Sequence, residues 1–415
     1  MLTVNSNLSR KKLLLKELLI SLATAFFFSS FIYFEYFDIS NKLVNTLFAL
    51  TALTLLLKIS KRAILFSGFF IGVSWFYWIG FSFEYQGVGY LTPFIPFVFG
   101  VIYMLFFAPL TLTSNIYIRA TLLFLLSFIE PMNFNWMQIE LLFVQSYIGV
   151  QKYHLALVLL TLVLTFNIKK YYKFIAILPL LLALFPIHVT PIKEPQLKIK
   201  LVQTQIAQKD KWRYNYLNTT FQIIFNEIQQ AIDKDYDVIL LPESVFPIYM
   251  NKNPFIIKML QELSYKITIV AGSLYKENKE HFNVTYMFKN GSYKIAKKVV
   301  LVPFGEYIPL PKFAQDFINN TFFGGTSDFS QASQPTDFFI DGVKFRNAIC
   351  YEATTQKIYE GDVKYVLAIS NNGWFVPSIE PTLQNLLLHY YAKKNNVIIY
   401  HSANMAGSGV IYPSF

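Results

Sequence analysis

The chain has 415 residues, a net charge of +11 and a positive mean hydropathy of +0.39, and 54% of its residues are hydrophobic. So large an apolar fraction exceeds that of an ordinary soluble protein and predicts a membrane protein with more than one domain. The basic residues lie in short groups between apolar runs, which is the distribution that membrane topology requires. The positive charge therefore does not indicate a nucleic-acid partner.

The amino terminus carries a basic segment, Arg10 to Lys16, followed by an apolar run. This arrangement is typical of a cleaved signal peptide or of a retained first membrane span. No small-residue cleavage site closes the run, and further apolar segments follow it. We therefore expect the run to be retained as the first span.

Apolar runs fill the amino-terminal half and predict a helical membrane bundle over residues 1–190. A helix needs about 20 residues to cross the hydrocarbon, and a shorter run can be accommodated by tilting or local thinning of the bilayer. We expect seven spans, of which the second and fifth are the shortest: Leu18–Phe34, Leu43–Leu57, Ala63–Phe83, Tyr90–Thr113, Ile116–Ile129, Tyr153–Ile168 and Phe174–Val189.

The orientation of the bundle follows from its loops, because cytoplasmic loops hold the excess of lysine and arginine. With the first basic segment inside, the other inner loops contain Lys58 to Arg62, Arg119, and Lys169 to Lys173. The outer loops then contain the acidic residues Glu35, Asp38, Glu84, Glu130 and Glu140. An odd number of spans places the rest of the chain outside the cytoplasm, whereas the loss of the fifth span would place it inside.

Two of the outer loops are rich in aromatic residues. One interpretation is an interfacial aromatic belt, and the other is a lipid-facing portal beneath an external active site. The residues concerned are Trp75, Tyr77, Trp78 and Tyr85 in one loop, and Phe134, Asn135 and Trp136 in the other.

The carboxy-terminal half reads as a soluble domain over residues 198–415, joined to the bundle by a linker at 191–197. Its β-type runs alternate with amphipathic runs, which predicts an α/β or α+β layered domain. We expect helices at Thr219–Ile232, Pro254–Leu263 and Glu380–Lys393. We expect strands at Lys198–Ile206, Val238–Leu241, Ile267–Ala271, Val284–Phe288, Lys297–Val302, Phe338–Ile340, Val343–Cys350, Val363–Ser370 and Val397–His401.

Three segments of this half carry reactive groups at or after predicted strands. They are centred on Glu243, Lys298 and Cys350, which lie 55 and 52 residues apart. Each has a plainer interpretation when it is taken alone. Glu243 could begin a helix, Lys298 could belong to a solvated face, and the single cysteine could be a small buried hydrophobe.

Taken together, the three residue types suit acyl transfer through a covalent intermediate. That chemistry needs a nucleophile, a base and a group that stabilises the oxyanion. A thiol is mostly protonated at neutral pH, so a carboxylate must accept its proton, and we expect a neighbouring cation to favour the thiolate.

The motifs resemble those of the nitrilase superfamily, and the membrane half narrows the resemblance to the apolipoprotein N-acyltransferases. The resemblance runs from about Ala63 to the end of the chain. The segments that carry it are Gly68–Gly72 with Trp75, Tyr77, Trp78 and Ile79; Lys200–Ile206 with Lys211 and Trp212; Leu241–Ser244; Lys298–Glu306; Cys350–Glu352; and Ser370–Phe375.

The resemblance implies a multi-span α-helical membrane bundle joined to an αββα sandwich domain of the nitrilase type. By resemblance, Cys350 is the nucleophile, Glu243 is the general base and later acid, and Lys298 stabilises the oxyanion. Glu306 supports the lysine, and further residues are assigned in the same way: Tyr351 and Glu352 shape the loop of the cysteine, while Trp212 and Trp374 contact substrate or merely pack.

The implied reaction moves an acyl chain from a phospholipid, through a cysteine thioester, to the α-amino group of a diacylglyceryl-cysteine lipoprotein. The implied location is the bacterial inner membrane, with the catalytic domain on its periplasmic side. We expect membrane lipids and an apolipoprotein as partners, and no cofactor or metal, because the five histidines lack the spacing of paired ligands.

The chain departs from the family pattern at three points. Family members usually continue with further strands and a last membrane span, whereas this chain ends at Phe415. Asn372 stands where the family has aspartate, and Ala296 where a tyrosine is common. Two other functions stay open: a membrane-tethered amidase, in which water resolves the thioester, and an inactive membrane scaffold.

Overall fold

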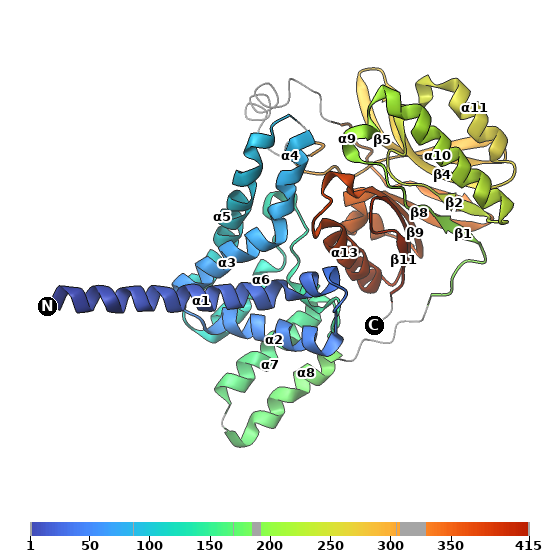
Figure 1. Ribbon diagram of the computed structural model, residues 1–415. Helices are drawn as coiled ribbons and strands as arrows, with labels where there is room; N and C mark the ends of the chain where they lie inside the picture. Colours follow the sequence, from blue (N-terminus) through green and yellow to red (C-terminus); the bar gives the residue numbers. More distant parts are fainter. Residues whose placement is uncertain are drawn as a thin grey trace. The chain divides into compact units, whose positions relative to one another are not determined.

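The computed structural model describes residues 2–85, 87–168, 170–184, 192–303, 305–307 and 329–413 (Figure 1). The chain divides into two compact units, one up to His188 and one from Val189 to Ser414. This division lies close to the predicted linker at 191–197, of which residue 191 is outside the described residues.

The first unit is helical. Three of its stretches are long and apolar enough to cross a membrane, namely Lys11–Tyr36, Lys61–Tyr85 and Gly89–Leu112. Every predicted span contains a helix, although the end of the seventh lies outside the described residues, and the number of crossings stays a prediction. The helices are α1 (Leu2–Tyr36), α2 (Lys42–Lys58), α3 (Lys61–Phe76), α4 (Ser82–Tyr85), α5 (Ile95–Phe107), α6 (Ile116–Leu126), α7 (Lys152–Asn167) and α8 (Ile177–Leu184).

Helices α3 and α5 pack backbone to backbone. A Cβ atom at Gly72 would lie 2.3 Å from the carbonyl oxygen of Phe99, and one at Gly68 would lie 2.6 Å from that of Tyr103. Only glycine permits so close an approach, which is how apolar helices gain dispersion contacts when both are surrounded by lipid.

The tryptophans of the two aromatic segments are buried. Trp75, Trp78 and Trp136 are at most 3% exposed, and the ring centroids of Trp78 and Trp136 are 5.2 Å apart. An interfacial belt faces lipid, so the belt interpretation is wrong for these three residues. The portal interpretation stays a prediction.

The second unit contains two sheets. The first is six-stranded with the order β1-β2-β4-β5-β6, and β3 pairs with β4. The second has the order β11-β10-β9-β8-β7. The strands are β1 (Ile199–Leu201), β2 (Val238–Leu240), β3 (Phe246–Tyr249), β4 (Thr268–Glu277), β5 (Glu280–Lys289), β6 (Ser292–Lys297), β7 (Asp337–Ile340), β8 (Val343–Ile349), β9 (Tyr365–Asn371), β10 (Ile398–Asn404) and β11 (Gly409–Ile411).

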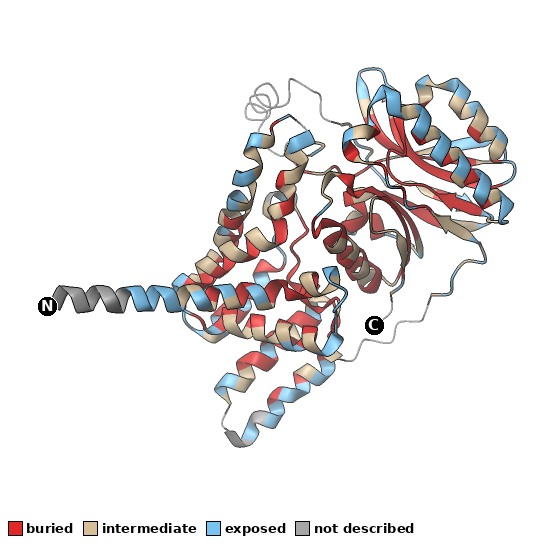
Figure 2. Ribbon diagram, in the orientation of Figure 1, coloured by how far each residue is buried: buried red, intermediate tan, exposed pale blue. Residues whose placement is uncertain are grey.

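The two sheets pack face to face between helices. Alternate residues of β2 face opposite ways: Val238 and Leu240 pack in a core with Phe345 and Leu367 of the second sheet. Ile239 lies in a second core under α10 (Tyr214–Asp233) and α11 (Pro254–Leu263). On the outer face of the second sheet, α13 (Glu380–Asn395) contacts β10 and β11. The unit is therefore an αββα sandwich, and its buried residues follow the strands in Figure 2.

Most predicted elements are present, with two corrections. The strand predicted at 198–206 extends only over β1, and the strand predicted at 297–302 is wrong beyond Lys297. The reason at the second place is that the backbone N–H groups of Val299 and Val300 donate to the carboxylate of Glu352 instead of to a neighbouring strand. Strands β3 and β11 and most of β6 were not predicted.

Candidate active site

Glu243 lies in a tight turn between β2 and β3. Ser244 adopts a positive φ of 47°, and the backbone of the turn rests on β4. A Cβ atom at Gly272 of β4 would lie 2.6 Å from the Cα atom of Glu243, so this strand position requires glycine. Glu243 is 7% exposed. Because β3 follows the turn, the interpretation of Glu243 as a helix-start residue is wrong.

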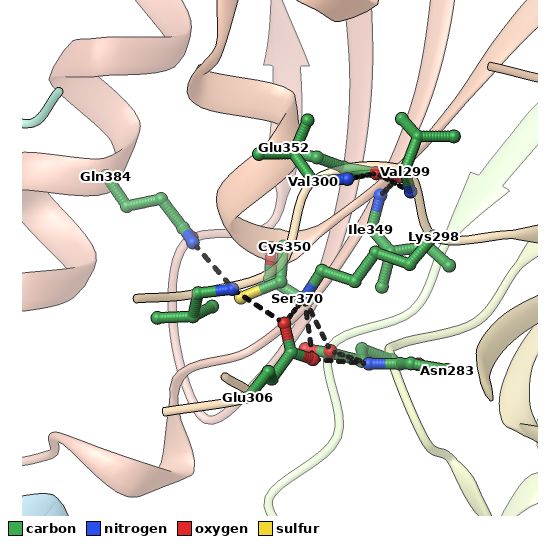
Figure 3. Close-up of polar contacts among 12 residues, drawn as sticks. Asn283, Lys298, Val299, Val300, Glu306, Ile349, Cys350, Glu352, Ser370 and Gln384 are labelled. Carbon is green, nitrogen blue, oxygen red and sulfur yellow. Dashed lines mark hydrogen bonds and ion pairs between the residues drawn. The ribbon is translucent and has the colours of Figure 1, made fainter. Parts of the chain in front are cut away.

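Lys298 follows β6 and points into the protein. Its side chain is 1% exposed, and its Nζ lies 2.7 Å from Oε2 of Glu306 and 3.9 Å from Oε1 of Glu243 (Figure 3). The solvated-face interpretation is therefore wrong. Burial alone would lower the pKa of Lys298, but Glu306 and Glu243 outweigh burial and raise it above its usual value. The two carboxylates therefore favour the charged form of the lysine.

Glu306 is held by a turn that its own backbone closes. Its N–H donates to the carbonyl of Val302 at 2.9 Å, and its Oε2 accepts from the N–H of Val302 at 2.9 Å. Asn283 of β5 lies between the two carboxylates, because its Nδ2 donates to Oε1 of Glu243 at 2.7 Å and to Oε1 of Glu306 at 3.2 Å. Asn283 and Lys298 thus fix the two glutamates side by side.

Cys350 lies directly after β8, where the chain turns sharply with a φ of 55°. It is partly exposed, and Gln384 Nε2 lies 3.9 Å from its sulfur. Burial and Glu243 raise the pKa of the thiol well above its ordinary value, while Lys298 lowers it. The effect of Lys298 has the expected direction, because this cation favours the thiolate, but burial and Glu243 outweigh it.

Glu352 joins the cysteine loop to the lysine segment. Its Oε1 accepts from the N–H of Ile349 at 2.8 Å, and its Oε2 accepts from those of Val299 and Val300 at 2.7 and 3.1 Å. Burial raises the pKa of Glu352 to about 7, against Lys298 and these three donors, which lower it. Its neighbour Tyr351 is buried, at 3% exposure.

Two further ionisable groups lie near the thiol. Lys211, at the end of α9 (Gln208–Lys211), is 1% exposed and donates to the backbone carbonyl of Glu243 at 2.9 Å. Burial lowers the pKa of Lys211 to about 8, against Glu243 and Cys350, which raise it. Glu380, the first residue of α13, is 1% exposed, and burial followed by Glu243 raises its pKa well above the usual range.

The two tryptophans assigned to substrate contacts differ. Trp212 is 45% exposed at the end of α9. Trp374 is partly buried. Substrate contacts of either tryptophan stay predictions.

The sequence interpretation missed Asn283, Gln384 and Glu380. No motif marks Asn283, because its place between two glutamates follows from the pairing of β4 with β5. Gln384 and Glu380 have the spacing i, i+4 on a predicted helix, which puts them on one face but does not show which site they approach. Among the described residues, no three His, Cys, Asp or Glu side chains are grouped as metal ligands would be.

The arrangement can perform nucleophilic acyl chemistry. The Cys350 thiol lies within electrostatic reach of the buried Glu243 carboxylate and the Lys298 ammonium. The carboxylate can accept the proton of the thiol, and the ammonium can stabilise negative charge on the carbonyl oxygen that the sulfur attacks.

Comparison with known proteins shows which family this chain is similar to. Residues 15–186 match the family model described as the apolipoprotein N-acyltransferase integral membrane domain. The apolipoprotein N-acyltransferase of Wolinella succinogenes is 40% identical over 401 residues, which cover 96% of each chain. That of Helicobacter hepaticus is 36% identical over 93% of this chain and 98% of its own length.

Among solved structures, a CN-hydrolase superfamily protein from Xanthomonas campestris shares 13% identity with this chain. The match covers 51% of this chain and 76% of that protein, with a TM-score of 0.38.

Proposed function

The chain belongs to the apolipoprotein N-acyltransferase family, and on that premise we propose how its own residues perform the reaction. It is a multi-pass membrane acyltransferase that matures lipoproteins by N-acylation. In our proposal the acyl donor is a phospholipid and the acceptor is the α-amino group of a diacylglyceryl-cysteine. Glu243, Lys298 and Cys350 form the catalytic triad. The observation that carries this proposal is the buried Lys298 ammonium between the carboxylates of Glu306 and Glu243.

The first half-reaction forms a thioester on Cys350. Glu243 accepts the thiol proton as the sulfur attacks the ester carbonyl of the phospholipid. The Lys298 ammonium stabilises the negative oxygen of the tetrahedral intermediate. The intermediate collapses when the C–O bond breaks, and Glu243 returns its proton to the leaving lysophospholipid alcohol.

The second half-reaction moves the acyl chain to the lipoprotein. The neutral α-amine attacks the thioester carbonyl, the C–N bond forms and the C–S bond breaks. Glu243 accepts the proton that the amine loses, and this proton returns to the Cys350 sulfur. The enzyme is then restored to its starting state.

Glu306, Glu352 and Asn283 act by position. Glu306 pairs with the lysine, Asn283 holds Glu306 beside Glu243, and Glu352 ties the backbone next to Lys298 to the backbone next to Cys350. The proposal also includes three further residues. Tyr351 shapes the loop of the cysteine, and Trp212 and Trp374 contact the substrate.

The proposed location is the bacterial inner membrane, with the catalytic unit on the periplasmic side. The distribution of basic residues supports this orientation, because lysine and arginine gather in the loops that would be cytoplasmic. An enzyme whose donor is a membrane lipid also needs its active site next to the bilayer.

An assay with labelled phospholipid and a diacylated lipopeptide separates the candidate functions. Amine acylation of the lipopeptide is expected, and the Cys350→Ala variant should show none. Release of free fatty acid without lipopeptide acylation would instead indicate a membrane-tethered amidase, and neither product would indicate a scaffold. Lipopeptide acylation that persists in Cys350→Ala would refute the proposed mechanism.

A further inference from the structure

Gln384 brings a side-chain amide to the reacting sulfur. It lies on α13, is 1% exposed, and places Nε2 3.9 Å from Cys350 Sγ (Figure 3). A neutral thiol is a weak hydrogen-bond acceptor, which accounts for the long distance. A thiolate at the same place would be a much stronger acceptor.

The orientation of this amide is fixed by a chain of hydrogen bonds. Asn372, which is fully buried, donates from Nδ2 to the backbone carbonyl of Ala406 at 3.0 Å and to Oε1 of Gln384 at 3.0 Å. A backbone carbonyl only accepts, so the nitrogen of Asn372 must face it. The oxygen of Gln384 must then face Asn372, and its NH2 group must face the sulfur.

We propose that Gln384 is a further catalytic residue, whose amide N–H donates to the Cys350 sulfur whenever that sulfur carries negative charge, and that Asn372 positions it. The inference rests on the proposed function, because it assigns the sulfur the role of nucleophile and leaving group. Gln384 stabilises the thiolate after its proton passes to Glu243 and again when the C–S bond breaks. The amide exchanges no proton in either step.

The charged surroundings of the sulfur explain why such a donor is needed. Glu243, Glu380 and Glu306 all disfavour negative charge on Cys350, and the ammonium groups of Lys298 and Lys211 oppose them. Lys298 is itself engaged by Glu306 at 2.7 Å. A neutral donor adds stabilisation of the thiolate without adding another charge to a buried site.

The same geometry explains what an asparagine contributes at position 372. A carboxylate only accepts, so an aspartate at this position would attract the NH2 of Gln384 and turn its oxygen toward the sulfur. Asparagine is therefore the residue that allows Gln384 to act as a donor to Cys350.

The test uses the purified full-length protein and the alkylation of Cys350 by iodoacetamide as a function of pH. Cys350 is the single cysteine of the chain, so the reaction reports on this thiol alone. Only the thiolate reacts, and the midpoint of the rate profile is the apparent pKa of the thiol. Gln384→Met keeps the length and helix propensity of the side chain but removes the donor.

We expect Gln384→Met to raise the apparent pKa of the thiol by about one unit, which is a tenfold slower alkylation at a fixed pH below the midpoint. Asn372→Asp should raise it as well. The matched control is Asn385→Leu, which removes a half-buried amide from the neighbouring position of α13 and should leave the profile unchanged.

The double variant Gln384→Met/Asn372→Asp separates positioning from a direct effect of the new carboxylate. If Asn372 acts through Gln384, the second substitution adds little to the first. Full additivity would refute the positioning role, and an unchanged profile in Gln384→Met would refute the catalytic role. Gln384→Leu removes the same donor and tests the catalytic role independently if Gln384→Met fails to fold. Because the assay needs no lipid, its failure is distinct from a failure of thioester formation in the unmodified protein, which would refute the proposed function.

Discussion

Two adjacent lysines offer a direct test of the buried ion pair. Lys297 Nζ lies 2.7 Å from Glu277 and Lys298 Nζ lies 2.7 Å from Glu306, so their pair distances are equal. Their surroundings differ, because the side chains of the first pair are 29% and 48% exposed and those of the second are 1% and 13% exposed. The substitutions Lys297→Met and Lys298→Met therefore compare a solvated pair with a buried pair of the same shortest N···O distance.

The expected costs follow from this difference in burial. Removing one partner of a buried pair leaves an uncompensated charge and costs about 3–5 kcal/mol of unfolding free energy. Removing one partner of an exposed pair costs about 1 kcal/mol or less. For a unit of this size, the buried substitution lowers the melting temperature by about 10 °C.

The assay is thermal unfolding of the purified protein and its variants in the same detergent. Lys298→Met/Glu306→Gln should recover part of the stability, because the orphaned carboxylate is neutralised along with the ammonium. Equal melting temperatures for Lys297→Met and Lys298→Met would refute the view that Lys298 is held in a buried ion pair.

Three further predictions follow from the same unit. Because burial raises the pKa of Glu352 to about 7, its stabilising contribution is complete below the unfolded value of about 4.5 and is lost as pH rises through 7. The free energy of unfolding should therefore decline by about 3 kcal/mol over this range, and Glu352→Gln should remove the decline. An equal decline in the variant would contradict this prediction. Burial lowers the pKa of His401 to about 4, so its stabilising contribution is lost as pH falls from about 6.5 through 4. Over this pH range, the melting temperature of His401→Asn should fall less steeply than that of the unmodified protein. Gly272→Ala places a Cβ atom 2.6 Å from the Cα of Glu243 and should slow thioester formation at least tenfold, which corresponds to roughly 1.4 kcal/mol or more of activation barrier. The control Gly409→Ala, whose Cβ would have nothing within 4 Å, should leave the rate unchanged. Equal rates in the two variants would show that the turn at Glu243 tolerates displacement.

Glu243, Lys298 and Cys350 could be proposed as a triad from the sequence because each belongs to a recognisable short segment. The patterns alone predicted an α/β or α+β layered domain, because short apolar runs define strands such as β2 and β8 and amphipathic runs define helices, whereas the αββα sandwich was implied by the resemblance. The structure brings Glu243 and Lys298 within 3.9 Å, and both affect the pKa of Cys350, while the catalytic roles of the three residues stay a proposal.

The polar surroundings of the triad could not be predicted, because they depend on register and on packing between elements distant in sequence. Asn283 reaches two glutamates only because β5 pairs with β4 in one particular register. Gln384 reaches Cys350 only because α13 packs on the second sheet. Periodicity places such residues on a face but does not identify the opposing residue.

One missed element did have a local signal. Asn290 and Gly291 both adopt positive φ, at 48° and 74°, and join β5 to β6 as a tight hairpin. Asn-Gly between two β-type runs is the strongest short-range indication of such a hairpin. This signal predicts a strand that begins after Gly291 and ends before Lys298, as β6 does, and it leaves the lysine in the segment that follows the strand.

The most direct test of the central claim is the mass of the peptide that contains Cys350 after incubation with a phospholipid of defined acyl chains. The account predicts that this peptide gains the mass of one acyl group, that neutral hydroxylamine removes it, and that Glu243→Gln prevents its formation. Lipopeptide acylation that proceeds normally while Cys350 never acquires an acyl group would contradict the account.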